Sequence, residues 1–487
     1  MNAETALVVA LLLPAAGAIG IVRAGRLPNV RDAFTLTTSV VLAGVVWSLV
    51  PQVFAGARPS LHVTSILGEL AIAFEVEPLG MLFAAVASTL WIVNSIYSIG
   101  YMRGTGEKHQ TRFYACFAIA IAAALGVAFA GNLLTLFIFY ELLTLSTYPL
   151  VSHKGDPDTV KSARVYLGIL LSTSIGLLLP AMIWTYAVAG TLDFEAGGIL
   201  AGVLAGPGVG VLLALFVFGI GKAAVMPVHR WLPAAMVAPT PVSALLHAVA
   251  VVKAGVFTVV KVVVYVFGLD LLADGGFQQW LVYVTGATIV LASLIAMTKD
   301  NLKARLAYST VSQLSYIVLG AALATVSGII GAAMHIVTHA AGKITLFFCA
   351  GAIYTALHKT EVSELRGLGR TMPFTFAAFF IGSLSIIGLP PLGGLWSKWY
   401  LALGALETDQ LFAVAVLMVS SLLNIVYLLQ IPLLAFFGRP ATETADAGIH
   451  EAPIPCLIAI GLTAAASIAL FFLADPLYQL ARQLPLP

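Results

Sequence analysis

The sequence predicts an all-α integral membrane protein of about fourteen transmembrane helices, with two inverted five-helix repeats and two broken helices. Composition is the first reason: of the 487 residues, 60% are hydrophobic and 9% are charged, too few charges for an ordinary water-soluble surface. Apolar windows of about twenty residues also recur along the whole chain. Two of these windows are interrupted by proline and glycine at comparable places.

The expected helices follow from these windows, because about 20 apolar residues are needed to span the hydrocarbon core. The first window has no basic leader and precedes further spans, so we expect a retained helix and not a signal peptide. The fourteen windows lie at about 4–22, 34–54, 77–99, 113–130, 132–151, 163–188, 208–226, 242–266, 277–297, 304–321, 328–356, 372–399, 411–437 and 454–473.

Basic residues are sorted by loop. Seven alternate loops hold 17 of the 24 lysines and arginines, whereas the loops on the opposite side hold only Arg58 and Arg482. The positive-inside rule therefore places both termini outside the cytoplasm, in a multi-pass protein of the cell inner (plasma) membrane. The seventeen are Arg23, Arg26, Arg31, Arg103, Lys108, Arg112, Lys154, Lys161, Arg164, Arg230, Lys299, Lys303, Arg305, Lys359, Arg366, Arg370 and Arg439.

Two windows combine helix breakers with a lysine. Lys222 precedes Met226 and Pro227, and the window at 372–399 contains the run GLPPLGG at 388–394 before Lys398. Proline removes a helix donor and clashes with the preceding turn, so each span should be broken there. Either break alone could be a proline kink without function. The pair, at corresponding places in two halves, favours an inverted-repeat transporter.

Apart from charges at the first two positions of a window, six charged side chains fall inside the windows. A charge at bilayer depth costs at least about 2.5–3.5 kcal/mol on insertion scales, so each is a functional-site hypothesis with a partner or water to be found. The pattern indicates a protein that moves ions. The six are Glu141, Lys222, Lys253, Lys261, Lys343 and Lys398.

Four runs resemble the antiporter-like subunits shared by respiratory complex I, Mrp-type sodium/proton antiporters and membrane-bound hydrogenases. They lie at 226–255, 305–320, 335–351 and 388–398. The resemblance, closest to the shorter, Mrp D/A-like members, implies a fourteen-helix fold with a polar axis at the membrane midplane. It divides the chain into N-terminal helices at 1–112, a first repeat at 113–270, a second repeat at 271–440 and a last helix at 441–487.

The resemblance also pairs Glu141 with Lys222. A lone carboxylate in an apolar span needs a cation, and Lys222 would supply it from the helix just before the first break. The implied pair is a switch that holds the lysine protonated while intact and lets its proton go when separated. The alternative is a static pair that only stabilises packing, which is disfavoured because buried pairs seldom gain over apolar replacements.

His247 and Lys253 share one window but cannot face one direction. Six residues at about 100° each place them some 120° apart on a helix. In the family that the chain resembles, the central ionisable group stands at one or the other position. Lys253 is the first choice for a relay, since a desolvated lysine can exchange its proton, and His247 is the second. Lys261, near the end of that helix, either takes part or merely snorkels to the surface.

His335, His339 and Lys343 are spaced i, i+4 and i+8, which stacks them on one helix face. Such a stripe could hold a water chain with proton acceptors of graded affinity. The HxxxH spacing would also suit zinc, but no third ligand is evident, so no metal site is expected. The resemblance implies that Lys398, after the second break, ends the relay near one surface.

One segment departs from the resemblance. Many relatives carry an acidic residue in the segment at 234–238, whereas this chain reads AAMVA there. Coupling to a neighbouring subunit through that carboxylate is therefore not expected in this chain.

The function expected from these features is translocation of protons, with sodium exchange left open, by one membrane subunit of a multisubunit complex. The alternative is a membrane anchor or scaffold subunit of a redox or carbon-uptake complex. A redox enzyme is disfavoured because the chain has no dinucleotide fingerprint, cysteine cluster or paired haem histidines, so neither a cofactor nor a catalytic centre of its own is expected. A small-molecule carrier is disfavoured because titratable groups dominate the interior. The sorting of the basic residues argues against nucleic-acid binding, leaving lipid and other membrane subunits as expected partners.

Overall fold

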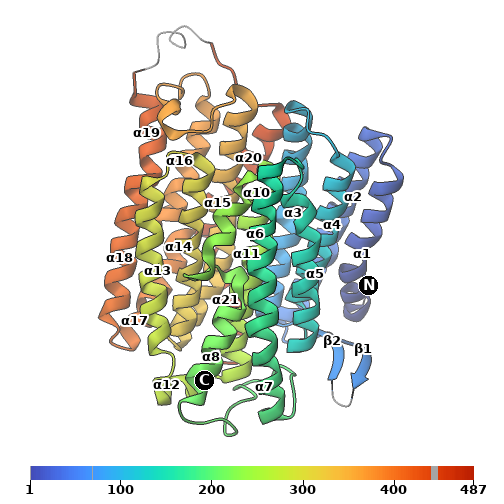
Figure 1. Cartoon of the computed structure of the whole chain (residues 1–487), viewed down its shortest axis with the longest axis vertical. Helices are drawn as coiled ribbons and strands as arrows, with labels where there is room; N and C mark the ends of the chain where they lie inside the picture. Colours follow the sequence, from blue (N-terminus) through green and yellow to red (C-terminus); the bar gives the residue numbers. More distant parts are fainter. Residues whose placement is uncertain (1, 68–69, 440–447, 487) are drawn as a thin grey trace.

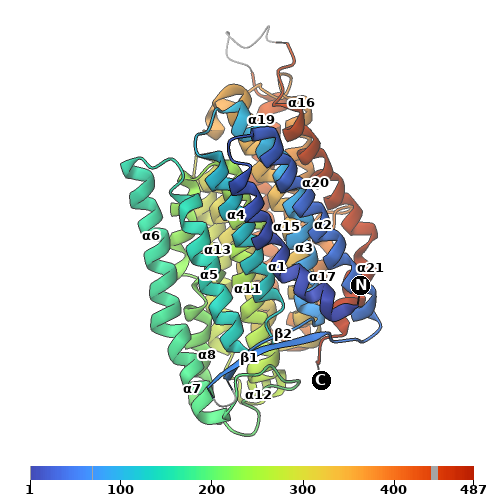
Figure 2. The same ribbon diagram turned by 90° about the vertical axis from the view of Figure 1, so that its right-hand side faces the viewer.

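The computed structural model describes residues 2–67, 70–439 and 448–486, which form an elongated bundle of roughly antiparallel helices (Figures 1 and 2). The first half contains α1 (Ala3–Arg23), α2 (Pro28–Phe54), β1 (Ser60–Leu67), β2 (Leu70–Glu75), α3 (Pro78–Gly104), α4 (Gln110–Ala128), α5 (Leu133–Val151), α6 (Pro157–Thr173), α7 (Leu179–Ala189), α8 (Gly208–Gly219), α9 (Trp231–Ala234) and α10 (Thr240–Ala244). The second half contains α11 (Val251–Val262), α12 (Leu269–Gly275), α13 (Gln279–Thr298), α14 (Leu302–Ala322), α15 (Val326–Leu357), α16 (Pro373–Ile387), α17 (Gly394–Glu407), α18 (Leu411–Asn424), α19 (Gln430–Phe437), α20 (Ile454–Phe472) and α21 (Ala474–Arg482).

Local sequence explains where many of these helices begin. Asn132, Asp156 and Asn301 each accept a hydrogen bond from a backbone N–H of the first turn of α5, α6 and α14. Proline occupies the first turn of α2, α3 and α16, where its missing donor costs nothing.

The predicted membrane class and helical fold are confirmed. In the described residues, 10 helices are long and apolar enough to cross a membrane, or up to 11 if a bent pair counts as one span. Each predicted window coincides with helical residues, but the windows at 208–226, 242–266, 304–321 and 372–399 contain broken, bent or more polar helices. The count of fourteen and the two repeats therefore stay predictions.

A β-hairpin between α2 and α3 was not predicted. Strands β1 and β2 pair antiparallel, with Ser60 opposite Glu75 and Leu61 opposite Phe74. Figure 1 places the hairpin at the same end of the bundle as α12 and the connection between α7 and α8, with α19 at the opposite end. We call this the hairpin end, and it provides a reference for the depth of the charged residues.

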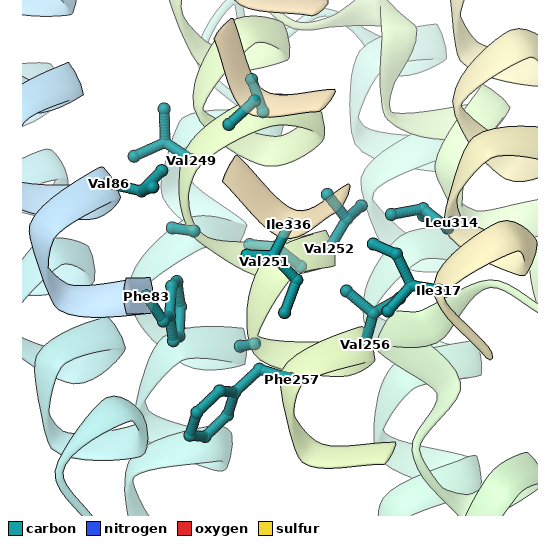
Figure 3. Packing of buried hydrophobic residues seen from close by; sticks show 14 of the residues in the cluster. Phe83, Val86, Val249, Val251, Val252, Val256, Phe257, Leu314, Ile317 and Ile336 are labelled. Carbon is teal, nitrogen blue, oxygen red and sulfur yellow. The ribbon is translucent and has the colours of Figure 1, made fainter. Parts of the chain in front are cut away.

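Helices α11 and α15 form the interior of the bundle. All residues of α11 are buried, and so is all of the most apolar stretch of α15. Figure 3 shows Val251, Val256 and Phe257 of α11 packed among Phe83 of α3, Ile336 of α15 and Leu314 and Ile317 of α14. Charges carried by α11 and α15 are therefore enclosed by protein and not exposed to lipid.

The first break lies earlier than the prolines suggested. Helix α8 ends at Gly219, so Lys222 lies in a 3₁₀ turn, Gly221–Ala223, within the break and not on the helix before it. The chain passes very close to its neighbours here, because an added Cβ at Gly219 would lie 2.4 Å from the Leu178 nitrogen. Ala224 then adopts a φ of 55°, which a continuing helix does not allow.

The second break matches its prediction. Helix α16 ends at Ile387, Gly388 has a φ of 90°, and α17 begins at Gly394 with Lys398 in its second turn. Each break contains one cis peptide bond before proline, at Pro227 and at Pro391.

Candidate functional site

The lysines and histidines singled out in the sequence lie inside the bundle. Lys222, Lys253 and Lys343 have 0% exposure, and His335 and His339 have 1%. Lys398 is half-buried. The side chain of His247 lies outside the described residues, although the backbone there belongs to a π-helical turn, Leu245–Val249, that precedes α11.

The closest contact between two ionisable groups in this set joins α11 to α15. Lys253 Nζ and His339 Nδ1 are 2.6 Å apart. A hydrogen bond between two nitrogens needs one of them as an acceptor, so an ammonium and a doubly protonated imidazolium cannot both be present here. The two groups therefore share a single proton position, which is the arrangement that a proton transfer requires.

A chain of ring contacts and one hydrogen bond continues from His339 toward the second break. The rings of His335 and His339 have centroids 5.7 Å apart. His335 Nδ1 lies 2.8 Å from Ser397 Oγ, the residue before Lys398, and the Tyr316 ring stacks on His335 at 5.6 Å. Lys398 Nζ lies 4.8 Å from the centre of the same tyrosine ring. Ser397 and Tyr316 thus connect the histidines of α15 with the lysine of α17.

The second break itself positions Lys398. Its ammonium donates to the Ile387 carbonyl at 2.9 Å and to Ser421 Oγ at 3.3 Å. Ile387 is the last residue of α16, whose final carbonyls have no partner within the helix. A cation is favourable at this negative end of the helix dipole. The interrupted helix therefore provides the polar environment that a charge at this depth needs.

Lys343 leads into a separate polar branch. Its Nζ donates to Ser309 Oγ at 2.6 Å, and the Tyr427 hydroxyl donates to the same oxygen at 2.8 Å. Arg305, in the first turn of α14, donates to the Tyr427 carbonyl at 3.3 Å and to Gln430 Oε1 at 2.9 Å. The contacts connect a buried lysine with the start of α14, one of the predicted basic loops.

Glu141 and Lys222 do not form an ion pair in this structure. Lys222 Nζ instead donates to Thr144 Oγ1 at 2.6 Å and to the Tyr140 carbonyl at 2.8 Å, and lies 3.1 Å from the centre of the Tyr140 ring. Both carboxylate oxygens of Glu141 are buried and have no hydrogen-bond partner in the described part of the chain. Lys222 is therefore docked on α5 beside Glu141 but is bound by neutral acceptors.

Close packing ties the first break to α11. An added Cβ at Gly255 would lie 2.3 Å from the Ala223 nitrogen and 2.3 Å from the Lys222 carbonyl carbon. Only glycine fits this approach, two residues after Lys253. The position of Lys222 and that of Lys253 are thus mechanically linked.

Lys261 does not snorkel to the surface, so that interpretation is wrong. It is 1% exposed, and its Nζ lies 2.8 Å from the Ala130 carbonyl and 3.5 Å from Glu77 Oε1. Glu77 stands at the boundary of a predicted window and was not singled out, although its position before Pro78 is a helix-capping signal.

The segment at 234–238 lies at the edge of a cavity of about 350 Å³ that Lys154, Lys303 and Thr240 also line. Lys303 Nζ donates to the Ala238 carbonyl at 2.5 Å. A backbone carbonyl therefore satisfies Lys303 in a segment whose own sequence has no acidic residue.

Sequence reasoning missed the neutral groups that surround the charged ones. Ser309, Tyr316 and Ser397 lie within the motif runs, and Tyr140 and Thr144 flank Glu141. The available signal was a hydroxyl on an otherwise apolar helix. Serine and threonine can satisfy their own helix backbone, however, so that signal does not identify a partner without the structure.

Comparison with known proteins places this chain in a family. The sequence pattern of the NADH:quinone oxidoreductase/Mrp antiporter transmembrane family matches residues 130–424. NADH-quinone oxidoreductase subunit N of Desulforudis audaxviator is 33% identical over 410 residues, covering 83% of this chain and 80% of that protein. A Na(+)/H(+) antiporter subunit of Alkalihalophilus pseudofirmus is 28% identical over 419 residues, covering 83% of each protein.

Solved structures agree on the fold. A chain of the Mrp complex from a Dietzia species superposes with a TM-score of 0.88 at 23% identity, covering 100% of this chain and 97% of that one. Some other relatives are longer, and this chain spans only 49% of chain 5 of the Synechocystis NAD(P)H-quinone oxidoreductase.

Proposed function

The chain belongs to the NADH:quinone oxidoreductase/Mrp antiporter transmembrane family, and on that premise we propose that it conducts protons as one membrane subunit of a larger complex. The observation that carries the proposal is the 2.6 Å contact between Lys253 and His339 in the interior of the bundle. An apolar pair would stabilise the packing more than a buried lysine that shares a proton with a histidine, so packing does not explain this contact. Its use is the transfer of that proton.

The conducting path runs from Lys253 through His339 and His335 to Lys398. Ser397 and Tyr316 bridge the distance between His335 and Lys398, and small movements or single waters complete the transfers across the remaining gaps. Lys343 exchanges protons with the branch through Ser309 toward Arg305. His247 remains the second candidate for the central group.

Glu141 and Lys222 act as the switch. Thr144 lies three residues after Glu141, and residues at this spacing are neighbours on one helix face. Lys222 Nζ, bound to Thr144, is therefore within a side-chain rotation of the carboxylate. Pairing would hold the proton on Lys222, and the separated arrangement would let it pass to the relay.

The path divides into two repeats, at 113–270 and 271–440, flanked by N-terminal helices at 1–112 and a last helix at 441–487. Each repeat supplies one broken span with a lysine, Lys222 in the first and Lys398 in the second. Both termini lie outside the cytoplasm of the plasma membrane, with the basic loops inside. Sodium exchange is tested by replacing sodium with choline in the assay buffer. A loss of proton flux on replacement would mean that protons are exchanged for sodium.

The test uses inside-out vesicles that carry the whole complex, with proton uptake followed by a pH-sensitive dye. Lys253→Met is expected to stop uptake, whereas Lys161→Met, which removes an exposed lysine from α6, should leave it unchanged. Unchanged uptake in Lys253→Met at normal protein levels would make the chain an anchor or scaffold and not a conductor.

A further inference from the structure

A second buried lysine and carboxylate meet near the hairpin end of the bundle. Lys261 Nζ lies 3.5 Å from Glu77 Oε1, and the Tyr265 hydroxyl donates to Glu77 Oε2 at 2.7 Å. Lys261 also donates to the Ala130 carbonyl at 2.8 Å. We call Lys261, Glu77 and Tyr265 the hairpin-end cluster. Nothing in the relay described above uses it.

The cluster holds its charges in well-defined positions. Glu77 caps α3, accepting from the backbone nitrogens of Leu79 at 3.0 Å and Gly80 at 2.8 Å, so the positive end of the helix dipole stabilises its negative charge. Lys261 Nζ lies 4.5 Å from the centre of the Phe194 ring, which favours its positive charge. The protein therefore stabilises the ionised form of each group, which is the state from which the proposed transfer starts.

The cluster adjoins the surface of the hairpin. Glu75, the last residue of β2 and two residues before Glu77, is half-buried. Burial raises the pKa of the Glu75 carboxyl, opposed by the charge of Lys261 and reinforced by that of Glu77. This places a carboxyl group that binds protons more readily than an exposed glutamate beside the cluster.

The other side of the cluster faces the relay across an apolar layer. Lys253 and Lys261 both lie on α11, about 12 Å apart along its axis at 1.5 Å per residue. Val256 and Phe257 lie between the two lysines in the sequence of α11, and both are buried. Figure 3 shows Phe83 of α3 beside Phe257, and the two rings are 5.2 Å apart. Apolar constrictions of this kind close a pathway when dry and open it when wetted.

We propose that Lys261 and Glu77 are the site at which protons pass between the relay and the solution at the hairpin end. The proposal rests on the proposed function, since it extends the same path. In the transfer, the Lys261 ammonium gives a proton to the Glu77 carboxylate, leaving a neutral amine and a neutral acid. The acid releases the proton to water beside Glu75, and the amine takes the next proton from the Lys253 side when the apolar layer is wetted.

Lys261→Arg separates this role from a structural one. Arginine keeps the positive charge and the pairing with Glu77 but does not release its proton in a protein. In vesicles with the whole complex, we expect proton uptake to fall by about 100-fold, the scale of a lost proton-transfer group. Lys161→Arg, the same change at an exposed position of α6, should leave uptake unchanged. A structural ion pair predicts uptake near wild type in both variants.

A double variant gives a second readout in case arginine does not fit. Glu77→Gln with Lys261→Met removes both charges together, so a merely structural pair should be replaced with little loss. The proposal requires uptake to stay low in the double variant even when protein level and thermal stability equal those of the wild type. Recovery of uptake there would overturn it.

Lys253→Met in the same preparation distinguishes the two proposals. If Lys253→Met keeps uptake, the proposed function fails first. If Lys253→Met stops uptake while Lys261→Arg and the double variant conduct normally, the relay stands and protons reach the solution by a route other than the hairpin-end cluster.

Discussion

Gly255→Ala should impair conduction without touching a charged group. The added Cβ would lie 2.3 Å from two backbone atoms of the first break, more than about 1 Å inside ordinary contact, and backbone cannot rotate away. Overpacking of this kind costs about 1–3 kcal/mol. Moving α11 by about 1 Å would lengthen the contact between Lys253 and His339 from 2.6 Å to about 3.6 Å, which is no longer a hydrogen bond.

The expected result is a loss of proton uptake of about 10- to 100-fold, because a misplacement of about 1 Å can cost 100-fold in a transfer step. Dye-monitored uptake in inside-out vesicles measures this, with protein level checked by immunoblot. Gly168→Ala is the matched control, since it lies on α6 with no atom within 4 Å of the added carbon. Uptake within about twofold of wild type in Gly255→Ala would refute the linkage between the break and α11.

Three further outcomes are expected. Glu141→Ala and Lys222→Ala should each abolish uptake with assembly largely intact, while Glu141→Asp should be milder because the charge is kept; normal uptake in either alanine variant would remove the switch. Lys398→Ala should stop uptake, whereas Lys398→Glu should retain part of it because a carboxylate also exchanges protons, and equal loss in both would argue against a relay through this position. Engineered cysteines near Asp193, Asp274 and Glu407 should react with an impermeant reagent added outside. Cysteines near Lys161, Lys303 and Arg366 should stay unlabelled. If two positions adjacent along the chain show the opposite labelling, a helix between them has been miscounted.

The charged residues of the interior could be predicted from sequence because placing each charge at bilayer depth costs free energy. Lys343 is conspicuous in an apolar helix whatever its neighbours are. Its partner is not conspicuous, since Ser309 lies 34 residues away and could equally have satisfied its own helix. The sequence therefore identifies which groups need a partner, and three-dimensional packing decides which groups provide it.

The positions of the breaks show the same limit. The GLPPLGG run identified the second break because glycine and proline stand where α16 ends. At the first break the prolines at 227 and 233 were the visible signal, but α8 already ends at Gly219. An added Cβ at Gly219 or Gly221 would clash with Leu178 or Thr173, so only glycine fits this close packing. A helix that ends through tertiary packing carries only a weak local signal, so the sequence alone places Lys222 on the helix and not in the break.

The separation of Glu141 from Lys222 bears on how such a switch operates. A carboxylate buried without a donor is costly, by several kcal/mol for a full charge, whereas Lys222 already has two hydrogen-bond acceptors, Thr144 and Tyr140. Bringing the two together would satisfy Glu141 and leave only neutral hydroxyl and carbonyl groups unpaired. For an ionised Glu141, forming the ion pair with Lys222 therefore lowers the free energy. Because Thr144 and Glu141 share one face of α5, the step needs a side-chain rotation and no movement of the helix.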